Sequence, residues 1–272
     1  MRDGRPIFVQ HDAAWEATLG REWWRYILEA SLKDRHHAKQ GRSIARWTIA
    51  NARHKRTVFV KRYYHCSMWK SLLWRWLRRG KSEAWYEWHH LQQARQIGIP
   101  TPKPVAVAEV GNQAWLQSVL VVEELTDQVA LHEAIPTAAA HFDSRDFRQW
   151  KEGLIDEVAR LVRQLHGQSL FHRDLYLCHF FIPRQFQYDC PSHWINRVTL
   201  IDFHRLTRRR FFRLPARIKD LAQLEYSSYV VGINDDDRRR FWHRYNQGHK
   251  CRMLRFLVRF KSRLYRRRER VR

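Results

Sequence analysis

The segment LFHRDLYLCHFFI, residues 170–182, decides the interpretation of this sequence. An apolar helical pattern leads into it and an apolar strand pattern leaves it, so that His172-Arg173-Asp174 falls at the bend between them. Further along, Leu200-Ile201-Asp202-Phe203-His204 places a second acidic residue at the end of an apolar run. Two carboxylates presented in this way suit phosphoryl transfer, in which one steers the attacking hydroxyl and the other holds the metal ion on the nucleotide.

The length and composition indicate a globular chain that can bury a core. At 272 residues it most naturally forms one two-lobed domain or two small domains. Hydrophobic residues at 44% and aromatic residues at 14% exclude a disordered chain. The formal net charge of +24 favours polyanionic surroundings, which include nucleic acid, an acidic membrane face and a phosphorylated glycolipid. Charge alone does not choose among these three.

The cysteines and the first residues favour a reducing compartment. The four cysteines contain no CxxC pair, so reduced thiols are the default: Cys66, Cys178, Cys190 and Cys251. Residues 1–6 lack the apolar core of a signal peptide. No window approaches the run of about eighteen apolar residues that spans a bilayer. We therefore expect a cytoplasmic protein that can also meet a membrane surface.

The first part of the chain predicts one helix followed by two strands. The helix, over residues 12–30, follows from apolar residues that recur every four positions: Trp15, Leu19, Trp23 and Ile27. Residues 41–50 and 57–64 read as strands around a polar turn, and residues 68–79 form a basic stretch rich in tryptophan. Lys61 is then a cation within an apolar strand. It is either an edge-strand lysine that reaches water or a phosphate-binding lysine.

A second helix is predicted over residues 82–96, with Ser82 as its cap and Gly98 after its end. Glu87 falls within the apolar stripe of this helix. A carboxylate that is turned inward needs a cationic partner, because burying it unpaired costs several kcal/mol. Lys61 is the natural partner of Glu87, and Glu83, one turn earlier, is the competing choice.

The middle of the chain predicts a further strand pair and a long helix. Residues 104–109 and 116–124 read as strands, and Glu123 ends the buried part of the second. In a two-lobed enzyme this position would be the linker between the lobes, and otherwise it is an ordinary strand exit. Residues 127–148 look loose and polar, whereas 150–164 carry apolar residues at helical spacing.

The last part of the chain is strongly basic. Residues 205–219 contain seven basic residues and no acidic one, and a helix is predicted from Asp220 onward. A C-terminal helix has one apolar face, with arginine and lysine over the other: Met253, Phe256, Leu257, Phe260 and Leu264. Such a helix can lie in the headgroup plane of a membrane.

Taken in chain order, Lys61, Glu87, the HRD segment and the DFH triplet give a pattern that resembles the protein-kinase-like superfamily. More closely, the chain resembles the lipopolysaccharide core kinases (the Kdo/heptose, WaaP-like family), which phosphorylate sugars of the inner core. The motifs that carry this resemblance, in addition to residues 172–182, are GIPTPKPVA, LIDFHR and RIKDLAQLEYSS. The resemblance covers roughly residues 43–228.

The resemblance implies an α+β, two-lobed protein-kinase-like fold that uses ATP and Mg²⁺. A small β-rich N-lobe with one key helix would take residues 1–125, and a larger, mainly helical catalytic lobe would take residues 126–272. By position, the expected site residues have these roles: Lys61 holds the nucleotide phosphates, Glu87 orients Lys61, Glu123 lies in the nucleotide-binding linker, Asp174 is the base or orienting carboxylate for the acceptor hydroxyl, Asp202 binds magnesium, and Asp220 ties its helix to the catalytic loop. His172 is expected to be a packed core histidine.

Three departures from ordinary protein kinases narrow the expected substrate. Gly41 is the one glycine of the first predicted hairpin, so the chain has no Gly-rich loop. His179 stands where protein kinases place the asparagine for a second magnesium, and because Mg²⁺ prefers oxygen ligands it would hydrogen-bond, bind phosphate or pack in the core instead. His204 replaces the glycine of DFG, and no APE motif follows, which counts against a protein substrate.

The sequence therefore predicts a sugar kinase that acts on heptose or Kdo of a lipid A–core acceptor, peripheral to the cytoplasmic face of an inner membrane. Two alternatives stay open: an inactive kinase-like protein that binds RNA or another polyanion, and a kinase for a protein or another small molecule. Nucleic acid is not the expected partner, because no RNA- or DNA-binding motif is present. We expect Asp174 and Asp202 to face one nucleotide cleft, with Lys61 over it from the opposite lobe.

Overall fold

The computed structural model describes residues 5–30, 42–50, 55–65, 81–111 and 116–270. The chain divides into two compact units, which are taken one at a time. Unit 1 comprises Met1–Gln93 and Pro102–Leu125, and unit 2 comprises Ala94–Thr101 and Thr126–Arg272. The expected division into two lobes at residues 125 and 126 stays a prediction, and residues 94–101 belong to unit 2. Gly41 and the tryptophan-rich stretch over 68–79 lie outside the described residues.

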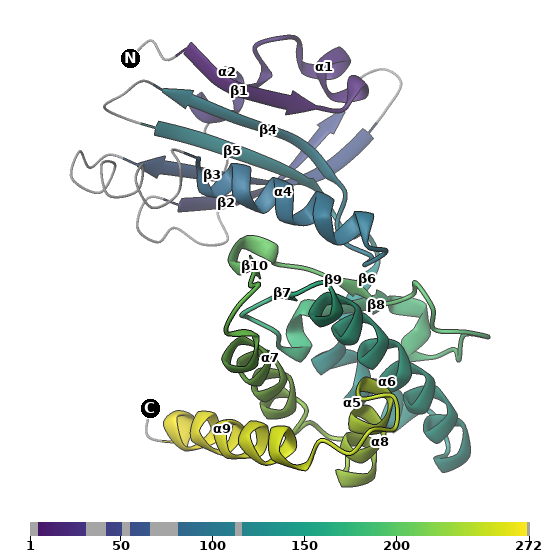
Figure 1. The fold of residues 1–272 in the computed structure, drawn as a ribbon. Coiled ribbons are helices and arrows are strands. Elements are labelled where there is room, and N and C mark those ends of the chain that lie inside the picture. Colours follow the sequence, from purple (N-terminus) through teal and green to yellow (C-terminus); the bar gives the residue numbers. More distant parts are fainter. Residues whose placement is uncertain (1–4, 31–41, 51–54, 66–80, 112–115, 271–272) are drawn as a thin grey trace. The chain divides into compact units, whose positions relative to one another are not determined.

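A five-stranded antiparallel sheet with the order β1-β4-β5-β3-β2 forms the framework of unit 1 (Figure 1). Its strands are β1 (Arg5–His11), β2 (Arg42–Ala50), β3 (Lys55–His65), β4 (Pro104–Gly111) and β5 (Leu116–Glu123). The expected strand pairs are present, with Lys61 opposite Leu120 of the central strand β5. Strand β1 was not predicted. It pairs with β4 at the edge of the sheet. Its apolar residues Ile7 and Val9 are exposed, so the strand has no buried apolar face that a sequence pattern could indicate.

One face of this sheet is covered by two short helices, α1 (Ala13–Leu19) and α2 (Trp23–Glu29). Their buried Trp15, Trp23 and Ile27 belong to one core cluster with Val58 and Val60 of β3. The prediction of a single helix over 12–30 is wrong. The chain turns at a glycine at position 20 with φ +80°, a conformation that continues no right-handed helix.

The opposite face of the sheet carries α4 (Glu83–Gln96) (Figure 1). The Ser82 hydroxyl accepts a hydrogen bond from the Trp85 amide at 3.1 Å, which confirms the predicted cap. The chain leaves the helix through Gly98, whose φ of +75° suits a residue without a side chain. Lys61 and Tyr63 of β3 point to this face, because alternate residues of a strand face opposite sides.

Unit 2 is mainly helical (Figure 1). Its described residues also form three short pieces of 3-10 helix (η) and small two- and three-stranded sheets. Its elements are β6 (Gln128–Ala130), α5 (Leu131–His141), α6 (Ser144–Gly167), β7 (Leu170–Phe171), η1 (Leu177–His179), β8 (Phe180–Pro183), η2 (Arg184–Gln187), β9 (Thr199–Leu200), η3 (Phe203–Arg205), β10 (Thr207–Arg208), α7 (Arg213–Ser227), α8 (Asp235–Tyr245) and α9 (Arg252–Arg270). The strand order of the larger sheet is β6-β8-β9, and β7 pairs with β10.

The expectation of a loose, polar segment over 127–148 is wrong. Most of it forms β6 and α5, and α6 begins at Ser144 rather than at residue 150. The buried residues of α5 recur at helical spacing: Leu131, Ala134, Ile135 and Ala138. Pro136 lies inside this helix and hides the pattern, because an interior proline normally ends a helix.

Helix α7 also begins earlier than predicted, at Arg213 instead of near Asp220. Pro215 lies in its first turn, where the missing N–H removes no helical hydrogen bond. Asp220 is therefore in the middle of α7, fully buried, and not at the N-terminal end of a helix. Helix α9 packs beside α7 (Figure 1).

No helix among the described residues is both long and apolar enough to span a membrane.

Candidate active site

In unit 1 the site is built from a lysine, a glutamate and a tyrosine. Lys61 forms an ion pair with Glu87 of α4, so the structure selects Glu87 over Glu83. The Tyr63 hydroxyl, two residues further along the same face of β3, donates a hydrogen bond to Glu87 Oε2 at 2.9 Å. The sequence interpretation missed Tyr63 as a member of this group.

Solvent has little access to the group of Lys61, Tyr63 and Glu87. The Glu87 side chain is 1% exposed, and that of Lys61 is 14% exposed. Burial, followed by the charge of Glu87, raises the pKa of Tyr63 well above its ordinary value, so the phenol stays protonated and keeps donating. Each oxygen of the Glu87 carboxylate thus has a donor, which is the condition for keeping a buried charge.

Glu123 ends β5, and its backbone amide donates to the Lys103 carbonyl at 2.9 Å. Its carboxylate accepts a hydrogen bond from Arg56 Nε at 3.1 Å. Its side chain is therefore tied to β3, and a role of this position in binding the nucleotide stays a prediction.

In unit 2 the loop over residues 172–174 is held by Asp220. The backbone amides of His172 and Arg173 each donate to one oxygen of the Asp220 carboxylate, both at 2.7 Å. Arg173 has φ +65°, a left-handed conformation that costs a residue with a side chain roughly 1–3 kcal/mol. The two hydrogen bonds to a buried, charged acceptor offset that cost and fix the direction in which Asp174 leaves the loop.

Asp220 is supported from behind by two further helices. His166, near the end of α6, lies with Nε2 at 3.3 Å from Asp220 Oδ2. Its other ring nitrogen is 2.7 Å from the hydroxyl of Tyr245, at the end of α8. Residues from α6, α7 and α8 thus meet behind the loop, which makes the position of Asp174 a property of the whole unit. The expected tie between Asp220 and this loop is present.

Asp202 follows β9 in a left-handed conformation, with φ +66°. The ring of His172 links the two segments, because its Nε2 donates to the Ile201 carbonyl at 2.9 Å. Burial lowers the pKa of His172, which fixes it as a neutral, packed histidine and agrees with its expected structural place. Two left-handed, non-glycine residues near one site are a concentration of backbone strain of the kind that functional sites hold.

These segments bring three side chains together. Asp174, His179 and Asp202 each offer a ligand atom, and these atoms lie within 4.8 Å of one another. His179 Nδ1 donates to the Asp174 carbonyl at 2.7 Å, and its Nε2 is 3.8 Å from Asp202 Oδ2. All three side chains are part-exposed, so the group is open to a ligand. The structure thus places the two predicted carboxylates of unit 2 in one cluster.

The donor set fits a magnesium ion through its carboxylates. Magnesium prefers oxygen ligands, and Asp174 and Asp202 supply them from two different segments. Burial lowers the pKa of His179, but contacts with Cys178, the Asp174 carbonyl and Asp202 outweigh this and raise it to about 9. The raised pKa favours the protonated ring, in which both nitrogens donate hydrogen bonds.

Several neighbours of the two carboxylates were not predicted as site residues. The Nδ1 atom of His204 pairs with Asp202 Oδ1, opposite the oxygen that faces His179. Gln223 Nε2 is 3.4 Å from Asp174 Oδ1, and Arg205 Nη1 is 3.9 Å from the same oxygen. Lys219 donates to the Arg173 carbonyl. The spacing of Gln223, three residues after Asp220 on α7, was the one signal that could have placed it at this loop.

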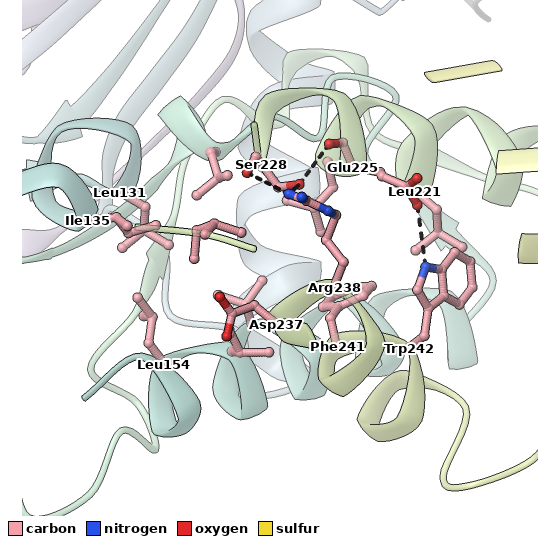
Figure 2. A pocket seen from close by; sticks show the side chains of 15 residues that line it. Leu131, Ile135, Leu154, Leu221, Glu225, Ser228, Asp237, Arg238, Phe241 and Trp242 are labelled. Atoms are coloured by element: carbon pink, nitrogen blue, oxygen red, sulfur yellow. Dashed lines mark hydrogen bonds between the residues drawn. The ribbon is translucent and has the colours of Figure 1, made fainter. Parts of the chain in front are cut away.

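Unit 2 also contains an apolar pocket between α5, α6, α7 and α8 (Figure 2). Figure 2 shows Leu131, Ile135 and Leu154 on one side of it and Leu221 and Trp242 on the other, with Arg238 between them. Arg238 donates to the Ser228 carbonyl at 3.2 Å, and Trp242 Nε1 lies 3.4 Å from Glu225 Oε2. An apolar lining of this kind does not suit a polyphosphate, so the carboxylate cluster is the better candidate for the chemistry.

Comparison with known proteins gives a family that covers most of the chain. The sequence model described as the lipopolysaccharide kinase (Kdo/WaaP) family matches residues 33–245. Two similar proteins are each named lipopolysaccharide core heptose(I) kinase WaaP. The one from Pseudomonas aeruginosa is 30% identical over 165 residues, with 58% of each chain covered. The one from Escherichia coli K12 is 31% identical over 156 residues, with 57% of each covered, so the chain spans little more than half the length of either relative.

A solved structure described as WaaP in complex with acyl carrier protein is similar along nearly the whole chain. Its TM-score is 0.66, its sequence is 25% identical, and 97% of both chains is covered. The likeness confirms the predicted α+β, protein-kinase-like fold, with the five-stranded sheet in unit 1 and the helices in unit 2.

Proposed function

The chain belongs to the lipopolysaccharide kinase (Kdo/WaaP) family, and from this membership we propose that it is an ATP-dependent kinase of a lipopolysaccharide inner-core sugar. The named relatives are heptose(I) kinases, so heptose is the first acceptor to test and Kdo the second. In the reaction, the acceptor oxygen bonds to the γ-phosphorus of ATP as the bond between that phosphorus and the β,γ-bridging oxygen breaks.

The observation that carries the proposal is the cluster of Asp174, His179 and Asp202, in which Asp220 fixes the loop that leads into Asp174. Phosphoryl transfer passes through a loose transition state, so catalysis is mostly positioning and charge neutralisation. The Asp174 carboxylate orients the acceptor hydroxyl and takes its proton. The protonated His179, which faces Asp202, adds positive charge where phosphate oxygens would gather.

In unit 1, the role proposed for Lys61 is to hold the nucleotide phosphates through its ammonium group. Glu87 keeps that ammonium in place, and Tyr63 keeps Glu87 in place. Asp202, with Asp174 close by, is the residue proposed to hold magnesium. When bound, magnesium neutralises charge on the phosphate oxygens.

The acceptor class also suggests where the protein works. A lipid A–core acceptor is anchored in a bilayer, and a chain of net charge +24 is attracted to an anionic surface. We therefore place the protein at the cytoplasmic face of an inner membrane, as a peripheral protein. The solved relative is a complex with acyl carrier protein. We propose such a protein as a second partner, to be tested by co-purification.

Two experiments test the activity. Mass spectrometry of the glycolipid from cells with and without this protein should show one added phosphate on an inner-core sugar. If the glycolipid from cells without the protein instead lacks the mass of a pyrophosphoryl group, the group transferred is pyrophosphoryl and not phosphoryl. With purified protein, Asp174→Asn should abolish nearly all transfer while leaving the circular dichroism spectrum unchanged. Wild-type transfer by that variant would contradict the assignment of Asp174.

The same experiments separate the alternatives. An inactive, RNA-binding protein would show steeply salt-dependent RNA binding and no transfer in either the wild type or the Asp174→Asn variant. A kinase for a protein or another small molecule would hydrolyse or transfer from ATP in a way that depends on Asp174, but would leave the mass of the glycolipid unchanged.

A further inference from the structure

Helix α9 has two apolar faces, and one of them is used for packing. Leu254, Val258 and Ser262 recur every four residues and are buried, at 8%, 0% and 2% exposure. Further along, the ring of Tyr265 stands edge-on to Tyr226 of α7, with 6.0 Å between the centroids. These contacts fix the orientation of α9 against α7, because the helix is rigid along this length.

The second apolar face points away from the protein. It consists of four large side chains spaced by three or four residues, which we call the α9 stripe: Met253, Phe256, Phe260 and Leu264. Their exposures are 76%, 68%, 55% and 39%. Single exposed apolar residues are ordinary, but a continuous row over three turns marks an interaction surface.

A row of arginines runs beside the α9 stripe. These residues are also spaced by three or four: Arg252, Arg255, Arg259, Arg263 and Arg266. The whole helix has nine lysine and arginine residues and one glutamate. Burial, and then the charge of Arg259, lowers the pKa of Arg255, so the positive charges on this helix are crowded enough to disfavour one another. An anionic surface would relieve that repulsion.

Some of these arginines already have partners in unit 2. Arg259 Nε is 3.8 Å from Glu225 Oε1, and the Arg266 guanidinium lies over the Tyr229 ring at 4.3 Å. Arg252 and Arg263 are exposed. Arg259 and Arg266 therefore contact the rest of unit 2. Arg252 and Arg263 are the positions best suited to test the charge of the row without disturbing packing.

We propose that α9 docks the protein on an anionic phospholipid surface, with the α9 stripe inserted at the headgroup–acyl boundary and the arginine row on the phosphates. An apolar stripe beside a basic row is the pattern of helices that lie in the membrane interface. The inference rests on the proposed function to the extent that a glycolipid acceptor obliges the enzyme to meet a bilayer. The stripe needs no complementary protein shape for this, because acyl chains adapt to any apolar side chain.

The docked helix is connected to the catalytic loop by three tyrosine rings in edge-to-face contact. Tyr226 of α7 contacts Tyr265 on one side and Tyr176 on the other, with 6.3 Å between the centroids of Tyr176 and Tyr226. Tyr176 is two residues from Asp174. Burial raises the pKa of Tyr265, and the nearby Tyr176, Asp220 and Asp174 contribute to that rise. Docking through α9 therefore sets the height of Asp174 above the bilayer.

The test is co-sedimentation of the full-length protein with vesicles of equal parts phosphatidylcholine and phosphatidylglycerol, and with vesicles of phosphatidylcholine alone. Phe256→Ser with Phe260→Ser should weaken binding to the mixed vesicles at least about tenfold, because two large apolar side chains no longer leave water. The matched control is Ile195→Ser with Val231→Ser, which removes two exposed apolar side chains elsewhere in unit 2 and should leave binding unchanged. Equal binding by the wild type and the α9 stripe variant overturns the proposal.

A charge variant checks the arginine row. Arg252→Gln with Arg263→Gln should weaken binding to the mixed vesicles about tenfold or more and leave the weak binding to phosphatidylcholine alone unchanged. The control is Arg145→Gln with Arg148→Gln, two exposed arginines of α6. If the control lowers binding as much as the α9 pair, the attraction belongs to the net charge of the protein and not to α9.

A kinase assay keeps this inference apart from the proposed function. The α9 stripe variant should phosphorylate a deacylated, water-soluble acceptor at the wild-type rate and a vesicle-borne acceptor more slowly. Vesicle binding through α9 without transfer to either acceptor would refute the function and leave the docking. Wild-type vesicle binding by the stripe variant, with loss of self-association or of acyl carrier protein binding, would assign the stripe to a protein partner and refute the docking.

Discussion

The Lys61–Glu87 pair of unit 1 is buried, whereas the carboxylates of unit 2 are open to solvent. The Glu87 side chain is 1% exposed, and those of Asp174 and Asp202 are 22% and 26% exposed. Glu87 has a donor on each oxygen, from Lys61 and from Tyr63. The unit 2 cluster instead holds two like charges beside a cationic histidine.

This difference separates what each group does for the fold. A buried, fully paired charge is part of the structure, because removing one partner leaves the other unpaired in a medium of low dielectric constant. Open carboxylates that repel each other contribute little to stability, and they are useful because a cation can join them. We therefore expect unit 1 to lose stability and activity together when its pair is broken, and unit 2 to lose activity alone.

The largest expected effect is that of Asp202→Asn. It removes the carboxylate proposed to hold magnesium and should lower transfer about a thousandfold. The melting temperature should change little, because the side chain is part-exposed. Transfer should be measured over a range of magnesium concentrations, together with thermal unfolding followed by circular dichroism. A melting temperature far below that of the wild type would contradict the expectation that unit 2 loses activity alone.

Breaking the buried pair should have the next largest effect. Lys61→Met leaves the Glu87 carboxylate without its cation and should destabilise unit 1 by about 3 kcal/mol, measured by urea unfolding. Lys61→Met with Glu87→Gln removes both charges but keeps an acceptor for Tyr63. The double variant should recover most of the stability and none of the transfer. If the single variant is as stable as the wild type, the pair is not needed for the fold.

A smaller effect is expected from Tyr63→Phe. It removes one hydrogen bond to a buried carboxylate and should cost about 2 kcal/mol in stability. Because Glu87 then holds Lys61 less firmly, the KM for ATP should rise while the kcat stays nearly constant. Tyr64→Phe, on the neighbouring strand position, is the matched control. Equal changes in the two variants would show that Tyr63 acts only through general packing.

The smallest expected effect is a dependence of stability on pH in unit 2. Burial lowers the pKa of His172 from its ordinary 6.5, so the unfolded chain binds more protons than the folded one just below that pH. The contribution of His172 is therefore complete above about pH 6.5 and is lost as the pH falls through its folded pKa. His172→Gln keeps an N–H for the Ile201 carbonyl but does not titrate. Its melting temperature should fall less steeply with acid than that of the wild type, and parallel curves would contradict the prediction.

Local patterns predicted some of the contacts in each unit. The alternation of β3 and the stripe of α4 predicted the contact between Lys61 and Glu87, because both patterns state which face a side chain occupies. They did not show that Tyr63 completes the group. In unit 2, HRD and DFH identified the carboxylates, but not the contact of His204 with Asp202 or that of Gln223 with Asp174.

Helices were predicted less well where one residue hides or breaks a pattern. Pro136 concealed α5, and the glycine at position 20 splits the helix expected over 12–30. Helix α7 begins before Asp220, because a proline in the first turn is compatible with a helix. Pro215 therefore lies inside the helix and does not mark its boundary.

The sequence by itself determined the order and identity of the residues proposed for phosphoryl transfer, from Lys61 and Glu87 to Asp174 and Asp202. It could do so because a motif consists of residues that are close together in the chain. The tertiary structure alone decided which side chains surround those groups and which of the two apolar faces of α9 is buried. Periodicity states that residues share a face, but the free energy of covering that face depends on what the rest of the chain packs against it.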